Sequence, residues 1–475
     1  MARRASAGVD REGRRRESAA RVCGAGRRSG VGRIPYNVEL VAGLRMDRRF
    51  AILFTIVFVD LIGFGIVIPV LLLHAQESFG ATDLQATMLL TSYSAGLVVA
   101  GPVMGRLSDA FGRRPVLILS QIGTFIGFLV LGFANSLFLL YLGRIIDGIS
   151  GGNITTATAY INDITTEKNR ARGFGLISAA FGAGFIVGPA LGGLVVNLAA
   201  GIDSLAAYSQ HAPFFVAAFF SLLSILGTTF LLPETLAPEQ RHPLGQPRPS
   251  RLGEGGLMDV LRIANVRIII LFSFIAFLGF ALLQSSFPLF ARRSLFPALP
   301  LLTVERNIGF LLTWVGVVSV TTQSFFVGPL VNRYGERRLV SVSAFARILA
   351  FLGTALARNS ITAAVSFIPL AAANAVNQPS LTSIISRFSP PHMRGRVLGA
   401  FQSSNSLTLV IGPIVAGLLL QMRIDGVSPE TEAALPLFVA AGLMAIAFLL
   451  SFRILRMDLP SQEAGSARPT AAPAP

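Results

Sequence analysis

The sequence contains few groups that could carry chemistry. Among 475 residues it has one cysteine, Cys23, and only 13% of the residues are charged. A lone thiol can form neither a disulfide within the chain nor a cysteine metal site. The histidines are too scattered to form a ligand cluster: His74, His211, His242 and His392. There is also no G-x4-G-K-S/T sequence to bind ATP phosphates. We therefore expect no metal, no cofactor and no enzymatic activity.

Acidic residues are scarce as well, with 24 Asp and Glu against 40 Lys and Arg, which gives a net charge of +16. Such a charge can indicate nucleic-acid binding, but here the basic residues lie in the amino-terminal tail and in short turns between apolar runs. Hydrophobic residues make up 52% of the chain, and its mean hydropathy is +0.65. One soluble core could not bury that much apolar surface, so the composition predicts a membrane protein and no nucleic-acid partner.

Twelve apolar runs are each long enough to cross a bilayer as a helix. They are residues 51–73, 86–104, 115–134, 137–158, 173–198, 212–232, 268–290, 308–331, 339–357, 361–385, 397–420 and 434–452. The organisation we predict is a basic, disordered tail (1–49), a six-helix half (50–232), a cytoplasmic linker (233–267), a second six-helix half (268–453) and a disordered tail (454–475).

The amino-terminal tail carries eleven arginines in residues 1–45 and no apolar segment of the kind that a secretory signal needs. Met46 directly precedes the first apolar run, and we expect it to be the functional start or the preceding tail to be dispensable. Alternate loops between the runs carry 17 Lys and Arg on one side and 5 on the other. Because positive loops face the cytoplasm, both termini are predicted there, in a multi-pass protein of the inner (plasma) membrane.

Several landmarks recur at a nearly constant offset. The turn from Gly105 to Arg114, which reads G-x3-D-x2-G-R-R, returns as G-x3-N-x2-G-E-R-R from Gly328 to Arg338. Gly188-Pro189 returns as Gly412-Pro413 at an offset of 224. This duplication predicts an all-α membrane protein of two parallel six-helix halves, with a ligand site near the bilayer midplane between them.

Four motifs together resemble the major facilitator superfamily, and within it the twelve-helix drug/proton antiporters of the tetracycline-efflux type. They are Asp60-Leu-Ile-Gly-Phe-Gly-Ile-Val-Ile-Pro69, the turn from Gly105 to Arg114, Arg144-x2-Asp-Gly-x-Ser-Gly-Gly152, and Gly184-x3-Gly-Pro-x2-Gly-Gly193. The resemblance covers about residues 50–452. It implies the major facilitator fold and transport by alternating access.

The resemblance also implies roles for two of the motifs. A cytoplasmic gate that pairs differently in the inward-open and outward-open states would consist of Gly105, Asp109, Gly112, Arg113 and Arg114. Asn332 replaces the acid in the second copy, so that gate is expected to depend less on charge. The antiporter motif of the fifth helix would consist of Gly184, Gly188, Pro189, Gly192 and Gly193. Glycines at i, i+4 and i+8 also allow close helix packing, which alone could explain them.

Charged residues inside a membrane usually face a cavity and have a function. Asp60, Arg144 and Asp147 are the proton-coupling candidates. If both carboxylates shared one guanidinium, one of them would take up a proton at moderate pH, and we favour Asp60 for that role. The alternative is an Arg144–Asp147 pair that only stabilises its own helix.

The second half offers neutral polar side chains for substrate binding. They are Gln284, Trp314, Asn374, Asn377, Gln378, Gln402 and Asn405. Interhelical packing is an equal explanation for each amide taken singly, and Trp314 could instead lie at a membrane interface. Tetracycline pumps typically have further acids in the third and ninth helices. Here residues 116–134 have none and the ninth run has Arg347, which disfavours tetracycline itself.

We therefore predict proton-coupled efflux of small amphipathic compounds by a monomer. The alternatives are a proton symporter or facilitator for a sugar or organic acid and, less favoured, a transport-inactive receptor or scaffold.

Overall fold

The computed structural model describes residues 48–166, 170–241, 257–390 and 393–457. The predictions for residues 1–45, for residues 242–256 of the linker and for residues 458–475 of the carboxy-terminal tail lie outside these ranges. The first half contains α2 (Arg48–Phe79), α3 (Asp83–Phe111), α4 (Arg113–Gly132), α5 (Leu137–Ser150), α6 (Asn153–Ile164), α7 (Arg170–Ala200) and α8 (Ala212–Leu231). The second contains α10 (Ala264–Phe290), α11 (Leu301–Thr321), α12 (Val327–Tyr334), α13 (Glu336–Ala355), α14 (Ser360–Phe388), α15 (Arg394–Gln421) and α17 (Leu435–Leu455).

Short elements lie between these helices. They are α9 (Leu257–Arg262), α16 (Pro429–Ala433), two 3₁₀ turns at Ala206–Tyr208 and Pro238–Gln240, and two π turns at Ala291–Leu295 and Thr322–Phe326. The second π turn joins α11 to α12 without interruption. Large apolar side chains on the outer helices are highly exposed, Phe230 at 77% and Ile361 at 76% among them. In a membrane these side chains would contact the hydrocarbon of the lipids, which explains why they are apolar although they are exposed.

Eleven of the described helical stretches are long and apolar enough to cross a membrane. The remaining predicted run, 137–158, is not one helix, because α5 ends at Ser150 and α6 begins at Asn153. The Gly151-Gly152 pair lies at this break. A Cβ on Gly152 would lie 2.5 Å from Met104 Cβ of α3, so only glycine fits there. The two short helices together make the remaining crossing of the twelve-helix architecture.

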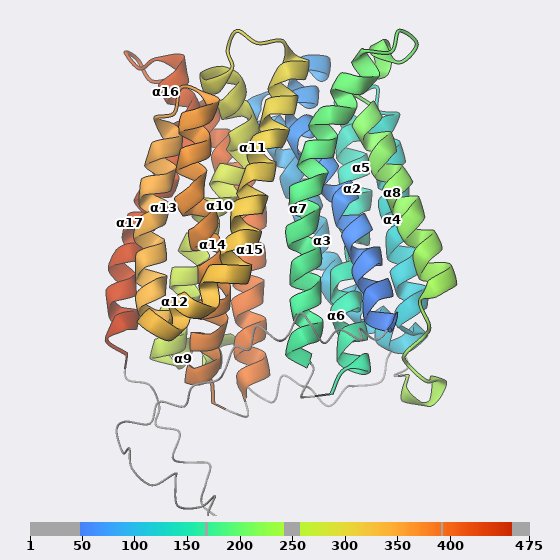
Figure 1. The fold of residues 1–475 in the computed structure, drawn as a ribbon, viewed down its shortest axis with the longest axis vertical. Coiled ribbons are helices and arrows are strands. Elements are labelled where there is room, and N and C mark those ends of the chain that lie inside the picture. The colour runs from blue at the N-terminus through green and yellow to red at the C-terminus, as the bar shows by residue number, and fades with distance from the viewer. Residues whose placement is uncertain (1–47, 167–169, 242–256, 391–392, 458–475) are drawn as a thin grey trace, which may run out of the picture. The chain divides into compact units, whose positions relative to one another are not determined.

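The two halves pack against each other mainly through two helix pairs, with smaller contacts of α2 on α10 and α11 and of α3 on α10. α7 of the first half contacts α11 of the second, and α3 contacts α15 (Figure 1). Glycines allow the first of these contacts, since a Cβ on Gly193 would lie 2.8 Å from Arg306 Cα. Within each half, corresponding helices also pair, α2 with α7 and α10 with α15. The predicted all-α fold of two related halves is confirmed.

Candidate functional site

The first basic turn is a single residue between two long helices. α3 ends at Phe111 and α4 begins at Arg113, with Gly112 between them at φ 108° and ψ 160°. This backbone region is essentially restricted to glycine, which explains the residue type. Gly105 has no such need, because a Cβ there would meet only Thr155 Cγ2 at 3.8 Å.

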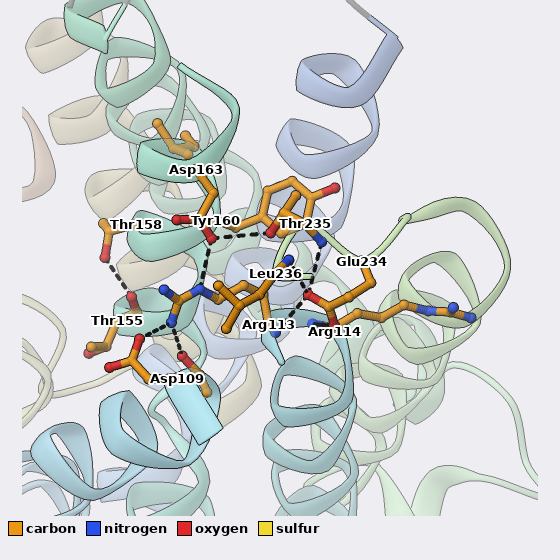
Figure 2. Close-up of polar contacts among 12 residues, drawn as sticks. Asp109, Arg113, Arg114, Thr155, Thr158, Tyr160, Asp163, Glu234, Thr235 and Leu236 are labelled. Carbon is orange, nitrogen blue, oxygen red and sulfur yellow. Dashed lines mark hydrogen bonds and ion pairs between the residues drawn. The ribbon is translucent and has the colours of Figure 1, made fainter. Parts of the chain in front are cut away.

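Arg113 is the centre of a buried ionic network at this turn (Figure 2). Its Nη1 donates to Asp109 Oδ1 at 2.5 Å and to Ser108 Oγ at 2.6 Å, and its Nε donates to Asp163 Oδ2 of α6 at 2.8 Å. The arginine side chain is only 9% exposed. The network therefore connects three helices of the first half through one guanidinium. Of the predicted gate residues, the structure brings Asp109 and Arg113 together directly.

Glu234 is a further member of this site that the sequence analysis assigned to the linker. Its carboxylate accepts the backbone N–H of Arg113 at 2.9 Å and that of Arg114 at 3.1 Å (Figure 2). These are the first two residues of α4, where unpaired N–H groups and the helix dipole favour an anion. Thr235 and Leu236 also donate their N–H groups to Glu234, at 2.9 and 3.0 Å. The start of the linker is thus fixed to the turn.

Two signals in the sequence could have revealed these partners. Glu234 follows directly after Pro233 at the end of an apolar run, where an isolated acid has no packing purpose. Asp163 lies 224 residues before Arg387, so the duplication offset pairs it with another charged residue.

Arg114 differs from Arg113 in that its guanidinium donates to the carbonyl oxygen of Thr229 rather than to an acid.

Inside the bundle, Arg144 and Asp147 form the predicted pair on one face of α5. Arg144 Nη1 donates to Asp147 Oδ2 at 2.7 Å, and both side chains are almost fully buried. The guanidinium carbon also lies 4.2 Å from the centre of the Tyr93 ring, a cation–π contact that was not predicted. Tyr93 in turn packs against Phe64, one helical turn along α2 from Asp60. The three charged residues therefore lie on adjoining helices around Tyr93.

Asp60 does not share the guanidinium. In the part of the chain that the structure describes, it forms no ion pair with Arg144, and its Oδ2 instead accepts a hydrogen bond from Asn153 Nδ2. Its other oxygen, Oδ1, is buried and has no partner among the described residues. Asp60 is thus held by a neutral donor, next to a small cavity that it shares with Gln121 and Asn153.

The glycine motif of α7 faces two different helices. A Cβ on Gly184 would lie 2.6 Å from Leu61 Cβ, and one on Gly188 would lie 2.6 Å from Gly65 Cα, both on α2. Gly192 also packs on α2, against Ile66, whereas Gly193 and Pro189 face α11 of the other half. One glycine-rich helix therefore packs tightly on the helix that carries Asp60 and on the opposite half of the molecule.

The polar candidates of the second half lie in different environments. Asn377 and Asn405 are buried and accept hydrogen bonds from Ser343 at 3.4 Å and from Ser273 at 2.7 Å. Gln378 and Gln402 are exposed, whereas Gln284 and Asn374 are partly buried. Arg347 is buried, and its Nη1 lies 3.4 Å from the carbonyl oxygen of Ala276.

Trp314 lies in a separate groove between α11 and α14. Its Nε1 donates to the carbonyl oxygen of Ala364 at 3.0 Å, and the groove has a volume of about 480 Å³. None of the other substrate-binding candidates lines this groove, whose walls include the exposed apolar side chains of Phe310, Ile361 and Val365. The structure therefore places Trp314 apart from the predicted amides.

Comparison with known proteins identifies one family along most of the chain. The Major Facilitator Superfamily model matches residues 53–295 and 289–474. The chain is 32% identical to the class C tetracycline resistance protein of Escherichia coli, over 78% of this chain and 89% of that protein. It is 29% identical to multidrug resistance protein 2 of Bacillus subtilis (strain 168), over 84% of this chain and 94% of that one.

Solved structures with the same fold are more distant in sequence. The human organic anion transporter MFSD10 (TETRAN) matches with a TM-score of 0.61 and 23% identity, over 85% of this chain and 99% of that one. A bacterial homolog of the human lysosomal transporter Spinster, inward-facing and unoccupied, matches with a TM-score of 0.68 and 16% identity, over 88% of this chain and all of that one. The agreement of motifs, fold and family model shows that the chain belongs to the Major Facilitator Superfamily.

Proposed function

We propose that this protein exports small amphipathic compounds in exchange for protons, by alternating access between its two halves. Tetracycline and multidrug resistance proteins among its relatives support drug efflux as the type of transport. The orientation that fits the loop charges has both termini in the cytoplasm, in the inner (plasma) membrane. The Arg113 network then lies on the cytoplasmic side, where it would act as a gate.

The observation that carries proton coupling is the environment of Asp60. A carboxylate in a membrane helix needs either a cation or a full set of donors when it is ionised. Among the described residues, Asp60 has one neutral donor, Asn153, and its other oxygen has no partner. Arg144 is already engaged by Asp147 at 2.7 Å. Asp60 is therefore the group in this cluster that can bind and release a proton without breaking an existing ion pair.

The packing of α7 connects this group to movement of the halves. Gly184 and Gly188 contact α2 next to Asp60, and Gly193 contacts α11 of the other half. A change at Asp60 that shifts α2 is thus transmitted to the interface by α7, which has glycine at these contacts and so no side chain there to absorb the shift. Outward movement of the compound and entry of the proton would then occur in opposite states of the same interface.

Everted membrane vesicles test this function. After respiration has acidified the vesicle interior, addition of a transported compound should release protons and raise the internal pH. We expect Asp60→Asn to reduce this release by about tenfold or more, because an amide cannot carry the proton. Asp203→Asn, the same change at an exposed loop residue, is the matched control and should behave as the unmodified protein.

The result that would overturn the proposal is proton release by Asp60→Asn equal to that of the control. A proton symporter is distinguished by the sign of accumulation in intact cells. An exporter lowers the cellular content of the compound when the proton gradient is present, whereas an importer raises it.

A further inference from the structure

A cavity next to Asp60 has the size of one water molecule. Its volume, counted as the space open to the centre of a water-sized sphere, is about 10 Å³, close to the smallest that can hold a water. Residues from α2, α4, α6 and α7 line it. Three of them are polar, Asp60, Gln121 and Asn153, and the remainder are apolar.

The side-chain amide of Gln121 has a fixed orientation. Its Nε2 donates to Ser224 Oγ at 2.8 Å, and Ser224 Oγ donates to the carbonyl oxygen of Ile56 at 3.3 Å. Because the serine proton is used on Ile56, Ser224 must accept from the glutamine, and Nε2 must point towards it. Gln121 Oε1 is therefore left as an acceptor. It is buried and has no partner among the described residues.

Asn153 is oriented in the same way. Its Oδ1 accepts the backbone N–H of Ile154 at 2.7 Å, and its Nδ2 donates to Asp60 Oδ2. The amide nitrogen has a second proton that these bonds leave over. The residues that line the cavity thus carry two acceptors that cannot satisfy each other and have no partner among the described residues, Asp60 Oδ1 and Gln121 Oε1, and one spare donor on Asn153.

We propose that Gln121 is a positioning residue that holds one water molecule against Asp60 Oδ1, and that this water is the last carrier on the path of the proton to Asp60. The inference rests on the proposed function. The water donates one proton to each of the two acceptors and accepts from Asn153, which gives it the three hydrogen bonds that a buried water typically makes. It also leaves no buried acceptor unpaired.

The same water serves Asp60 in both protonation states. When a proton reaches the water, another of its hydrogens moves to Asp60 Oδ1, so that the water is regenerated and the carboxyl becomes neutral. The carboxyl O–H then donates to the water oxygen, and the water still donates to Gln121. Release runs through the same steps in reverse.

Gln121→Met tests the proposal, since methionine has a similar length but no acceptor. We expect proton release on addition of the compound to slow by about ten- to hundredfold, the scale of a lost proton-transfer partner, with the concentration for half-maximal transport unchanged. Gln121→Glu restores an acceptor and should recover much of the rate. Gln421→Met, the same change at the exposed last residue of α15, is the matched control and should behave as the unmodified protein.

A second measurement detects the water itself. In difference infrared spectra recorded on proton release, a water O–H band that shifts in H₂¹⁸O should be present in the unmodified protein and in Gln421→Met, and absent in Gln121→Met. Because this band is read at equal amounts of inserted protein, poor expression of a variant does not imitate the result.

Unaltered proton release and an unaltered water band in Gln121→Met would overturn the inference. If Asp60→Asn is uncoupled at the same time, the proposed function stands and only the water is wrong. If Asp60→Asn is itself fully active, the function fails first.

Discussion

The two copies of the basic turn have the same backbone and different side-chain chemistry. Gly112 and Gly335 each separate two helices by one residue, at φ 108° and φ 78° with similar ψ. At the first turn Arg113 is 9% exposed and lies 2.8 Å from Asp163. At the second, Glu336 takes the place of Arg113, and its partner is Arg387, which is 54% exposed and 3.4 Å away.

The partners are related by the duplication with their charges exchanged. Glu336 lies 223 residues after Arg113, and Arg387 lies 224 residues after Asp163. Asn332 replaces Asp109, and a Cβ on Gly335 would meet nothing within 4 Å, whereas one on Gly112 would lie 2.5 Å from Glu234 Oε2. The helix break and one cross-helix pair therefore belong to both halves. Within the described ranges, the network that joins one buried arginine to several acids is seen in the first half.

This difference indicates where gating depends on charge. When a buried arginine moves away from one of several partners, that partner is left unpaired. Few arrangements of such a site are therefore low in free energy. An exposed pair can open and be replaced by water at little cost. We infer that the first turn is the one whose pairing must change between transport states, and that the second is mainly a structural repeat of it.

The largest expected difference between the two turns is the effect of removing Arg113 or Arg387 on stability. Arg113→Met removes the guanidinium that Asp109 and Asp163 share, and we expect a loss of about 2–3 kcal/mol of stability, somewhat below the cost for a fully buried pair. Transport should fall with it. Arg387→Met removes an exposed partner and should cost about 0–1 kcal/mol. Thermal unfolding in detergent and transport by cells at matched expression measure both effects.

A control for this prediction exchanges the charges of the second pair. Glu336→Arg combined with Arg387→Asp gives the second half the charge order of the first without adding further acids, and it should unfold at the same temperature as the unmodified protein. Equal losses from Arg113→Met and Arg387→Met would contradict the distinction between the turns.

Much of the fold could be predicted because it depends on patterns of single segments. Apolar runs of membrane-spanning length predicted the helices, and glycines at fixed intervals predicted close packing of the fifth helix on another, which in the structure is α2. The break between α5 and α6 was missed because Gly151 and Gly152 lie within an apolar run and are compatible with a helix. Only the approach of Met104 from α3 requires glycine there.

The candidate site was less accessible, because its partners come from distant parts of the chain. Nothing near Asp109 in the sequence shows that Asp163 and Glu234 share the turn with it. The prediction that Asp60 and Asp147 share Arg144 rested on their charges and on the family resemblance, which implied that the first and fourth helices line one cavity. The structure shows instead that Asn153, a neutral residue on α6, occupies one oxygen of Asp60. Which residue pairs with Asp60 depends on how the helices pack, and spacing along the sequence does not reveal that packing.

Substitution of Gly112 or Gly335 by alanine should also distinguish the two turns, with a smaller difference in stability. Both backbones lie in a region that is essentially closed to other residues, so Gly112→Ala and Gly335→Ala should each cost about 1–3 kcal/mol in strain. Gly112→Ala should cost more, because the new Cβ would displace the Glu234 carboxylate from the start of α4. The difference in unfolding temperature between the two variants measures this added term. Glu234→Gln should make that difference smaller, since the carboxylate is then already weakened as an acceptor.

The smallest expected effect on stability concerns Glu432, a hydrogen-bonded acid of the second half that lies outside the membrane-spanning helices. Glu432 of α16 accepts the backbone N–H of Ile424 at 2.9 Å and a hydrogen bond from Arg423 at 2.7 Å. The backbone N–H first, and then the arginine, hold the pKa of this carboxyl below its ordinary value. A lowered pKa in the folded state means that the stabilisation is complete above the ordinary glutamate pKa of about 4.3 and is lost as the pH falls through the folded value.

The unmodified protein should therefore unfold at a slightly higher temperature than Glu432→Gln at pH 7, and this advantage should shrink as the pH is lowered below about 4.3. Glu430→Gln, at an exposed position of the same short helix, is the matched control and should show no such dependence. If Glu432→Gln kept a constant difference at every pH, the carboxylate charge would not be what stabilises this loop. Glu432 would then stabilise the loop by packing and not by its charge. The difference in the importance of charge between the second half and the Arg113 network would be greater than we infer.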